Sequence, residues 1–362
     1  MAMTEKRKTK SNQLADIMRM QIVSGQILPG SQLESIAKLA KRHETTIATV
    51  SKAMDMLERN GLIKRYAGKG VFAAQSYPCR VAVVFDISDE QPDYVLSPIF
   101  CKFARRRFQA EGWSYQEFFN VSDAESAAGF IHKASENAFD LILVCSRYIA
   151  SKASAIFKNS QALIIGLYDY VGVENSMTYN VRQFVSSAVK LLNHHNVSDI
   201  MLLCNNRTET WRKIKNRPVA GYQEGLQSIS RLYDPVNVQK QELSCMGGFQ
   251  GANELFKRRK GSLMGIISVD SLMTLGIFQA LIYNKLRIPE DVIVVSHANP
   301  ECQITAPCLP VIYYVTPIEQ QIEEIISMMR KYQKTGLRNF GDREIELVKH
   351  SEALDKCLFI AS

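Results

Sequence analysis

Short hydroxyl side chains and lysines are concentrated in two stretches near the N-terminus. The first stretch holds Thr45, Thr46, Ala48, Thr49, Ser51 and Lys52, and the second is Gly68-Lys69-Gly70. Hydroxyls near the start of a helix can reach phosphates or base edges in the major groove. A lysine between glycines can lie against the phosphate backbone or enter the minor groove, because glycine allows a close approach. The two stretches predict a DNA-binding surface that includes Gly70; the alternative is a module of the same shape that contacts protein.

The distribution of charge favours the DNA interpretation. The chain has 362 residues and a net charge of +8. Residues 1–78 hold 13 Lys and Arg against 6 Asp and Glu, whereas the remaining residues hold 31 against 30. A basic first fifth attached to a nearly neutral remainder is typical of a module for nucleic acid or an anionic membrane.

The elements that must position these residues can be predicted from periodicity. Apolar residues recur at helical spacing over residues 12–24, with Leu14, Ile17, Met18 and Ile22 on one face, and a second short helix is expected over 35–42. Thr45 and Thr46 are suitable N-caps for a third helix, on which Ile47, Val50, Met54 and Leu57 form the predicted buried stripe. Strand-like runs at 62–66 and 71–74 flank the glycine turn. Three helices and a hairpin make a winged helix-turn-helix.

This module resembles the GntR-type DNA-binding domain of bacterial transcription factors. The resemblance covers residues 12–73 and is carried, in order, by Ile22-Val23-Ser24-Gly25, Leu28-Pro29-Gly30, Leu33, Leu39-Ala40, Thr49-Val50, Ala53, Leu57, Gly61-Leu62-Ile63 and Gly68-Lys69-Gly70-Val71-Phe72. The chain departs from the family at Ala37, Ile47 and Ser51, where arginines that contact DNA are frequent, and at Glu34, where proline is usual. Bidentate arginine–guanine contacts are therefore not expected from those three positions.

From Arg80 onward the pattern changes to alternating strands and helices, which predicts a doubly wound α/β architecture. Buried strands are expected at 81–86, 140–145, 163–167, 199–204, 263–269, 292–296 and 311–315, and helices at 98–111, 123–137, 181–195, 217–230, 248–260 and 271–286. Some 280 residues exceed one sheet, so two α/β lobes with a cleft between them are expected.

The second part resembles the effector-binding domain of the LacI/GalR repressors, which have the type I periplasmic-binding-protein fold. The likeness covers about 79–335 and is carried by Arg217-Pro218-Val219-Ala220-Gly221-Tyr222, by Val269-Asp270-Ser271-Leu272-Met273-Thr274-Leu275-Gly276 and by Ile288-Pro289-Glu290-Asp291-Val292-Ile293-Val294-Val295. The resemblance implies that a small molecule, as in sugar-responsive members, binds between the carboxyl ends of the strands.

The same resemblance suggests the ligand-binding residues, each with a structural alternative. Arg217 would pair with hydroxyls or a carboxylate of the ligand, or else form a cap or an ion pair between the lobes. Asp270 would accept from ligand hydroxyls, or else cap the helix over 271–286. Further candidates that follow strands or lie in loops are Asp86, Tyr94, Tyr168, Asp169 and Phe249, with ordinary packing as the alternative.

Two polar ligand contacts of the LacI pattern are replaced. Val269 stands where Asn is common, and Ser296-His297-Ala298 stands where Gly-x-Asp is common. An apolar side chain cannot replace a hydrogen-bond partner, so His297 or Asn299 would substitute, or else the ligand is not a typical sugar.

Other classes of function have no support in the sequence. There is no GxSxG, P-loop, HExxH or strand-linked GxGxxG motif, so neither an enzyme nor a cofactor site is predicted. The 8 cysteines include no CxxC pair, and His194-His195 point to different sides of a helix, so no metal site is expected. Reduced thiols and the lack of an apolar leader or spanning segment favour the cytoplasm.

The expected organisation is a winged helix-turn-helix domain at 1–75, a linker at 76–79 and a two-lobed effector-binding and dimerisation domain at 80–362. Such a combination occurs in arabinose-type repressors. The sequence thus predicts a dimeric, ligand-responsive transcription regulator, in which the helix over 271–286 serves the core and the dimer interface together. The competing hypothesis is a cytoplasmic solute-binding sensor without specific DNA binding.

Overall fold

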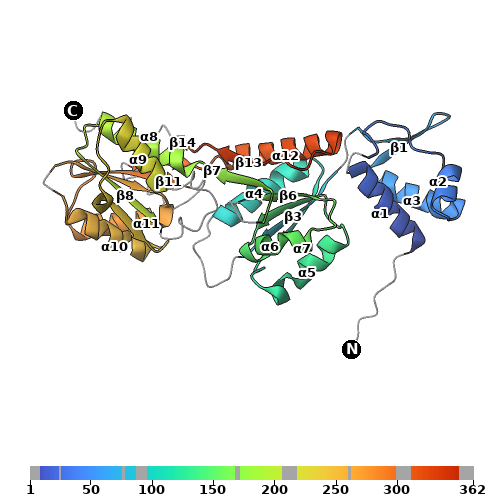
Figure 1. The fold of residues 1–362 in the computed structure, drawn as a ribbon, viewed down its shortest axis with the longest axis horizontal. Helices are drawn as coiled ribbons and strands as arrows, with labels where there is room; N and C mark the ends of the chain where they lie inside the picture. The colour runs from blue at the N-terminus through green and yellow to red at the C-terminus, as the bar shows by residue number, and fades with distance from the viewer. Residues whose placement is uncertain are drawn as a thin grey trace.

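The computed structural model describes residues 9–23, 26–75, 78–86, 96–167, 172–205, 218–259, 262–298 and 311–349. Three bodies follow one another along its longest axis: a small N-terminal head, an N lobe and a C lobe (Figure 1). The fold class is the predicted one, a two-lobed α/β body preceded by a small helical domain with a hairpin. Within the described residues, no helix combines the length and apolar character needed to cross a membrane.

In the residues that the structure describes, the head contains three helices and one hairpin. They are α1 (Lys10–Val23), α2 (Ile36–Arg42), α3 (Ile47–Arg59), β1 (Ile63–Tyr66) and β2 (Gly70–Ala73). Ser35 and Thr46 begin α2 and α3 as N-caps, each accepting from a backbone N–H three residues on. Asn60 ends α3, and Gly61 follows with a φ of 69°, a conformation that glycine adopts without strain.

The N lobe is a six-stranded sheet covered on both faces. Its strand order is β13-β7-β6-β5-β3-β4. The strands are β3 (Arg80–Phe85), β4 (Ser114–Phe118), β5 (Leu141–Cys145), β6 (Leu163–Gly166), β7 (Asn175–Tyr179) and β13 (Asp342–Ile345), all parallel to their neighbours. The helices are α4 (Leu96–Ala110), α5 (Ala124–Ser135), α6 (Arg147–Ser151), α7 (Ala153–Ile156) and α12 (Ile318–Thr335).

Alternation along β3 explains the two layers of the N lobe. Val81, Val83 and Phe85 share a cluster with residues of α4 and α12, whereas Ala82 and Val84 share one with α5 and α7. Successive strand side chains point to opposite faces, so an entirely apolar run is buried on both sides. The first cluster also contains the buried apolar residues of α1 and α3, so the head shares one continuous core with this lobe.

The C lobe repeats this plan. Its strand order is β14-β12-β11-β10-β8-β9, with only β14 antiparallel to its neighbour. The strands are β8 (Asp199–Asn205), β9 (Val238–Gln241), β10 (Met264–Ser268), β11 (Val292–Ala298), β12 (Val311–Val315) and β14 (Val348–Lys349). Helices α8 (Val181–His194) and α9 (Pro218–Ser228) cover one face, helices α10 (Cys245–Phe256) and α11 (Ser271–Tyr283) cover the other, and the short 3-10 helix η3 (Pro235–Asn237) precedes β9.

The chain passes between the lobes at three described places: after β7, after β12 and between β13 and β14. These crossovers are joined to one another, because Asn180 N–H donates to the carbonyl of Ile345 at 2.9 Å and Tyr179 Oη donates to Gln321 Oε1 at 2.5 Å. The first two crossovers leave from the carboxyl ends of their strands. The carboxyl ends of both sheets therefore face the junction of the lobes.

The seven strands and six helices predicted for the second part are all present within a few residues. The prediction omitted β4, β7, β9, β13, β14, the short α6 and α7, and the long α12, although Ile318, Ile322, Ile325 and Met329 of α12 have clear helical spacing. In the head, Ile47 was wrongly assigned to the buried stripe of the third helix, and Ile17, on the predicted apolar face of the first helix, is not covered either. Ile17 is 39% exposed and Ile47 is 62% exposed.

Candidate DNA-binding and effector sites

The core of the head covers α3 from Val50 onward but leaves the first turn of the helix uncovered. Val50, Ala53, Met54 and Leu57 are buried, but Ile47 lies one turn earlier and is exposed, which is why the predicted stripe was wrong at that residue. Thr46, Ala48 and Lys52 are exposed beside it, and Thr45, Thr49 and Ser51 are half-buried. The first turn of an α-helix that protrudes from a domain in this way can enter the major groove of DNA.

Two of the predicted hydroxyls are used inside the helix. Thr46 Oγ1 accepts from the N–H of Thr49 at 3.2 Å, and the two threonine hydroxyls lie 2.9 Å apart. The Thr46 hydroxyl therefore caps the helix first, and only its remaining hydrogen-bonding capacity faces outward.

The wing, which is the hairpin of β1 and β2, is held in place by contacts with neighbouring side chains. Gln32 Nε2 donates to the carbonyl of Lys69 at 2.8 Å, and Tyr66 and Phe72 pack edge to face with ring centroids 5.6 Å apart. Gly68 and Gly70 have φ values of 70° and 104°, and a Cβ at Gly70 would meet Gln32. Lys69 is exposed at the tip of this braced turn.

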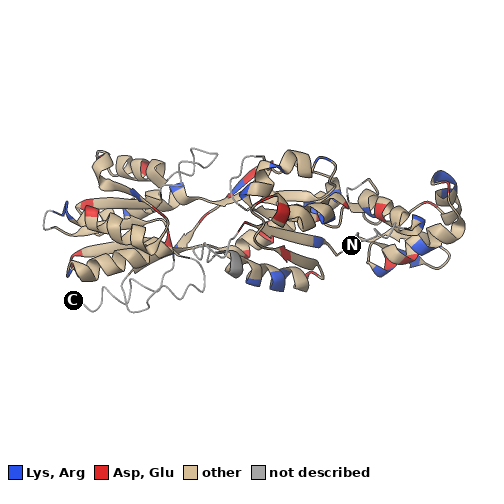
Figure 2. Cartoon of the chain, turned by 90° about the horizontal axis from the view of Figure 1, so that it is seen from below, with Lys and Arg blue, Asp and Glu red and all other residues tan. Residues whose placement is uncertain are grey.

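Most of the described arginines of the head form ion pairs, whereas its described lysines do not. Arg42 pairs with Glu34 at 2.7 Å, and Arg65 pairs with Asp55 at 2.8 Å and with Glu58 at 3.2 Å. In contrast, six exposed lysines of the head form no ion pair with any residue of the described chain: Lys10, Lys38, Lys41, Lys52, Lys64 and Lys69. Figure 2 shows Lys and Arg distributed over the head. Lysines bind phosphate as point charges, so this surface is suited to the DNA backbone more than to base edges.

The predicted effector residues fall into three groups. Arg217, Tyr94, Tyr168 and Asp169 lie outside the described residues, as does Asn299. Asp86, Asp270 and His297 lie at carboxyl ends of strands β3, β10 and β11, so they face the junction of the lobes. Phe249 does not.

Phe249 was expected to follow a strand or to lie in a loop, and this expectation is wrong. The residue lies inside α10, and its ring packs edge to face on Tyr283 with centroids 5.9 Å apart. Tyr283 is in the last turn of α11, whose first turn adjoins the end of β10. The ring therefore points away from the carboxyl ends of the strands.

Asp270 and Asp86 already have partners. Asp270 is the N-cap of α11, with its Oδ1 accepting from the N–H of Leu272 at 2.8 Å, which is the structural alternative for this residue. Asp86 Oδ2 accepts from Arg147 N–H at 3.0 Å and from Arg147 Nε at 3.4 Å. A ligand hydroxyl would compete with these bonds or use the remaining oxygen of each carboxylate.

A chain of hydrogen bonds that the sequence analysis missed lines the strand ends of the C lobe. Thr274 Oγ1 lies 2.8 Å from Ser268 Oγ and 2.6 Å from Ser296 Oγ, and all three side chains are buried. The adjoining His297 Nε2 lies 2.6 Å from Thr316 Oγ1 at the second crossover. Three serine and threonine residues at successive strand and helix ends were the available signal in the sequence.

His297 is kept neutral by its surroundings. Burial lowers its pKa from 6.5 to about 4, and a hydrogen bond with the Val269 backbone opposes that shift only in part. Within the described residues, no group of three His, Cys, Asp or Glu side chains is placed to hold a metal ion.

His297 predicts an acid-sensitive contribution to stability. Because its folded pKa lies below 6.5, the unfolded chain binds a proton that the folded chain excludes, so stability is complete above pH 6.5 and is lost as the pH falls toward 4. We expect the free energy of unfolding to fall by about 2 kcal/mol more in the wild type than in His297→Gln over this range. Urea unfolding at a series of pH values measures the difference; parallel curves for the two proteins would contradict it.

Known proteins are similar to both parts of the chain, the head and the two-lobed body. Residues 10–73 match the family described as "Bacterial regulatory proteins, gntR family". These residues form a GntR-type DNA-binding domain. They include α1 to β2, so the exposed helix start and the wing tip belong to the GntR-type domain. No curated protein sequence matches the chain.

The body has the fold of LacI-family regulators. The transcription regulator CcpA of Lactococcus lactis is 16% identical with a TM-score of 0.60, covering 76% of this chain and 99% of its own. The transcriptional regulator CelR in complex with cellobiose is 14% identical with a TM-score of 0.60, covering 96% and 99%. The dimeric Lac repressor is 15% identical with a TM-score of 0.59, covering 76% and 98%. The chain thus combines a GntR-type head with a body that has the fold of LacI-family regulators.

Proposed function

We propose that the chain is a ligand-responsive repressor, which binds operator DNA through the GntR-type domain and a small molecule, a sugar, between its lobes. The observation that carries the DNA half is the exposed start of α3 in a head with six exposed lysines that form no ion pair with the described residues. The ligand half is supported by the polar strand ends of the C lobe and by the shared fold of CelR, which binds cellobiose. In this proposal the domain comprises residues 1–75, the linker 76–79 and the body 80–362.

Within this proposal Arg217 engages the ligand directly, together with Asp270, Asp86 and His297. Tyr94, Tyr168 and Asp169 supply further contacts. The ligand favours one arrangement of the lobes, and the difference in its affinity for the two arrangements supplies the free energy that changes DNA binding.

We also infer that the working unit is a homodimer in the cytoplasm. Met246 in α10 and Ile282 and Tyr283 in α11 are exposed apolar side chains, which a dimer interface through α11 would cover. The dimeric Lac repressor, which shares the fold, supports this inference. Two heads on a twofold axis would bind a palindromic operator. A monomeric mass in solution at micromolar concentration would overturn it.

The proposal is tested by DNA binding of the purified protein to its own upstream region at two salt concentrations, with and without a panel of sugars. Specific, salt-sensitive binding that one sugar releases is the expected result. Absence of DNA binding under every condition would overturn the repressor and leave a small-molecule sensor.

Lys69 provides a prediction for the DNA contact. Lys69→Ala removes one phosphate contact, so it should weaken binding to all duplexes to a similar extent and reduce the slope of log K against log salt by about 1. Fluorescence anisotropy of labelled operator and scrambled duplexes measures both. Lys158→Ala, which changes an exposed lysine on the N lobe, is the control. An unchanged slope would remove Lys69 from the interface.

Ile47 provides a prediction for sequence preference. An exposed isoleucine at the start of α3 can contact the 5-methyl group of thymine in the major groove. Replacing that thymine by uracil removes only the methyl group, and we expect the affinity of the wild type to fall about threefold to fivefold. With Ile47→Ala the same uracil duplex should bind as well as the thymine duplex. Equal losses in the two proteins at every thymine tested would contradict the contact.

A further inference from the structure

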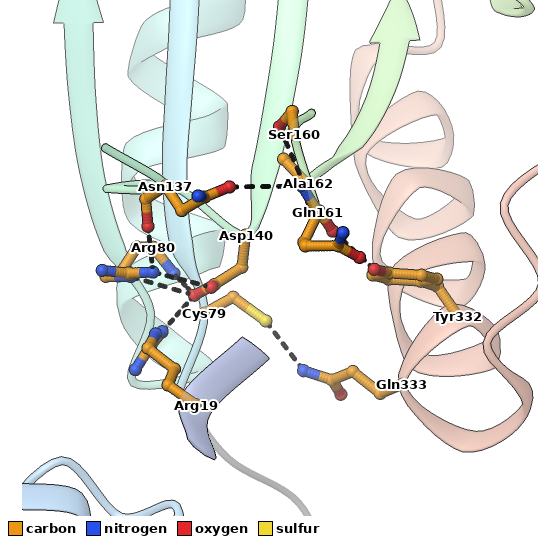
Figure 3. Close-up of polar contacts among 10 residues, drawn as sticks. All are labelled: Arg19, Cys79, Arg80, Asn137, Asp140, Ser160, Gln161, Ala162, Tyr332 and Gln333. Atoms are coloured by element: carbon orange, nitrogen blue, oxygen red, sulfur yellow. Dashed lines mark hydrogen bonds and ion pairs between the residues drawn. The ribbon is translucent and has the colours of Figure 1, made fainter. Parts of the chain in front are cut away.

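One buried ion pair joins the head to the N lobe. Arg19 Nη2 in α1 donates to Asp140 Oδ2 at the start of β5, and the two residues are 7% and 2% exposed (Figure 3). They lie 121 residues apart in sequence. α1 therefore has two buried faces: Leu14, Met18 and Ile22 pack inside the head, and Arg19 faces the lobe.

The lobe satisfies Asp140 without the head. Asp140 Oδ2 accepts from the N–H of Arg80 at 2.8 Å and from Arg80 Nε at 3.3 Å, and Oδ1 accepts from Arg80 Nη2 at 3.1 Å. Arg80 Nη2 also donates to the carbonyl of Asn137 at 2.7 Å. If Arg19 leaves, the carboxylate is still paired, so release of the head does not create an isolated buried charge.

The head side of the contact is only partly satisfied. Arg19 Nε is buried without an acceptor among the described residues. A groove of about 430 Å³ runs beside Arg19 between α1, the end of α3 and the start of β3. In the docked head Arg19 Nε thus has no acceptor from the described chain, whereas in the released head it would be exposed to water. This unpaired donor reduces the preference for the docked state, which makes a reversible contact physically reasonable.

The linker next to this pair is tied to a helix that starts at the junction of the lobes. Gln333 Nε2 near the end of α12 donates to Cys79 Sγ at 2.8 Å, and Tyr332 Oη donates to the carbonyl of Gln161 at 2.5 Å (Figure 3). α12 begins two residues after Thr316, the partner of His297. A single rigid helix of 18 residues thus reaches from the crossover to the residue before Arg80.

We propose that Arg19 and Asp140 form a releasable latch that holds the head against the N lobe, and that α12 transmits lobe movement to this latch through Cys79. Its regulatory use rests on the proposed function: a ligand between the lobes shifts the crossover, α12 moves with it, and the position of the head changes. The latch itself is a property of the folded chain and needs neither DNA nor ligand.

Cys79 reports directly on the latch. It is fully buried at the groove beneath α1, and burial raises the pKa of its thiol, so in the docked state it reacts slowly with alkylating reagents. Cys145 is also buried, but it lies at the far end of β5 and away from the head. Peptide mass spectrometry after timed treatment with N-ethylmaleimide gives both rates in one experiment.

We expect Arg19→Ala to raise the alkylation rate of Cys79 on the order of tenfold and to leave that of Cys145 unchanged. Arg19→Lys, which keeps the charge, should give a Cys79 alkylation rate between that of the wild type and that of Arg19→Ala. Arg105→Ala removes an exposed arginine pair on the same lobe and should change neither rate. An unchanged Cys79 rate in both Arg19 variants, or an equal rise at Cys79 and Cys145, would overturn the latch.

DNA binding separates this proposal from the repressor. With a released latch the two heads lose their fixed spacing, so Arg19→Ala should weaken operator binding on the order of tenfold while affinity for a scrambled duplex stays the same. Wild-type protein that binds no DNA, together with faster Cys79 alkylation in Arg19→Ala, would overturn the proposed function and support the latch. Unchanged operator affinity despite faster alkylation would overturn the role of the latch in spacing the heads.

Discussion

Asp140→Ala should lower the free energy of unfolding by about 3–5 kcal/mol, because it leaves two guanidinium groups near the base of β5 without their carboxylate. Arg19 would lose the acceptor that joins the head to the lobe, and Arg80, whose side chain is 31% exposed, would turn partly to water. Urea unfolding followed by circular dichroism measures the change.

Asp123→Ala is the matched control for Asp140→Ala. Asp123 caps α5 in the same lobe through local bonds to Ser126, so its loss should cost only about 1 kcal/mol. If the two substitutions lower the free energy of unfolding equally, the ion pair at the base of β5 contributes no more to stability than a helix cap does.

The second large effect concerns the contact between α10 and α11. A Cβ at Gly276 would lie 2.0 Å from the carbonyl oxygen of Cys245 and 2.4 Å from the backbone N of Phe249. Backbone atoms cannot rotate away as a flexible side chain can, so Gly276→Ala should separate the helices at a cost of about 3 kcal/mol or more. Thermal unfolding of the variant measures this cost.

The control for Gly276→Ala is Gly129→Ala in α5. A Cβ at Gly129 meets no atom within 4 Å, so this change should leave stability equal or raise it by about 0.5–1 kcal/mol through helix propensity. Equal thermal stability of the two variants would show that α10 and α11 are not packed as closely as described.

The architecture could be predicted because its signals are local. Apolar runs such as Val81–Phe85 and Leu141–Cys145 specify buried strands by themselves, and the capping hydroxyl of Thr46 marks the start of α3. Ile47 shows what periodicity cannot predict. Apolar residues at helical spacing can continue into the first turn of a helix even where no neighbouring element covers that turn. Only the packing of the head shows that this turn protrudes.

The sites were harder to predict because they depend on pairs distant in sequence. Arg19 and Asp140 meet across 121 residues, and no spacing rule connects them. Phe249 was assigned to the ligand by its type, but the orientation of α10 turns it to Tyr283. Asp270 lies at the expected strand end, where its own helix already uses one oxygen.

The route of the chain between the lobes also bears on the order in which they form during synthesis. The C lobe is made almost entirely from the continuous stretch 181–315, whereas the N lobe needs α12 and β13 from the region 318–345 to cover one face and to complete one edge of its sheet. A chain leaving the ribosome thus carries an N lobe with an uncovered apolar face while the later lobe already has all its main strands. We expect the nascent N lobe to depend on chaperones until α12 emerges, although it is the first lobe to be translated.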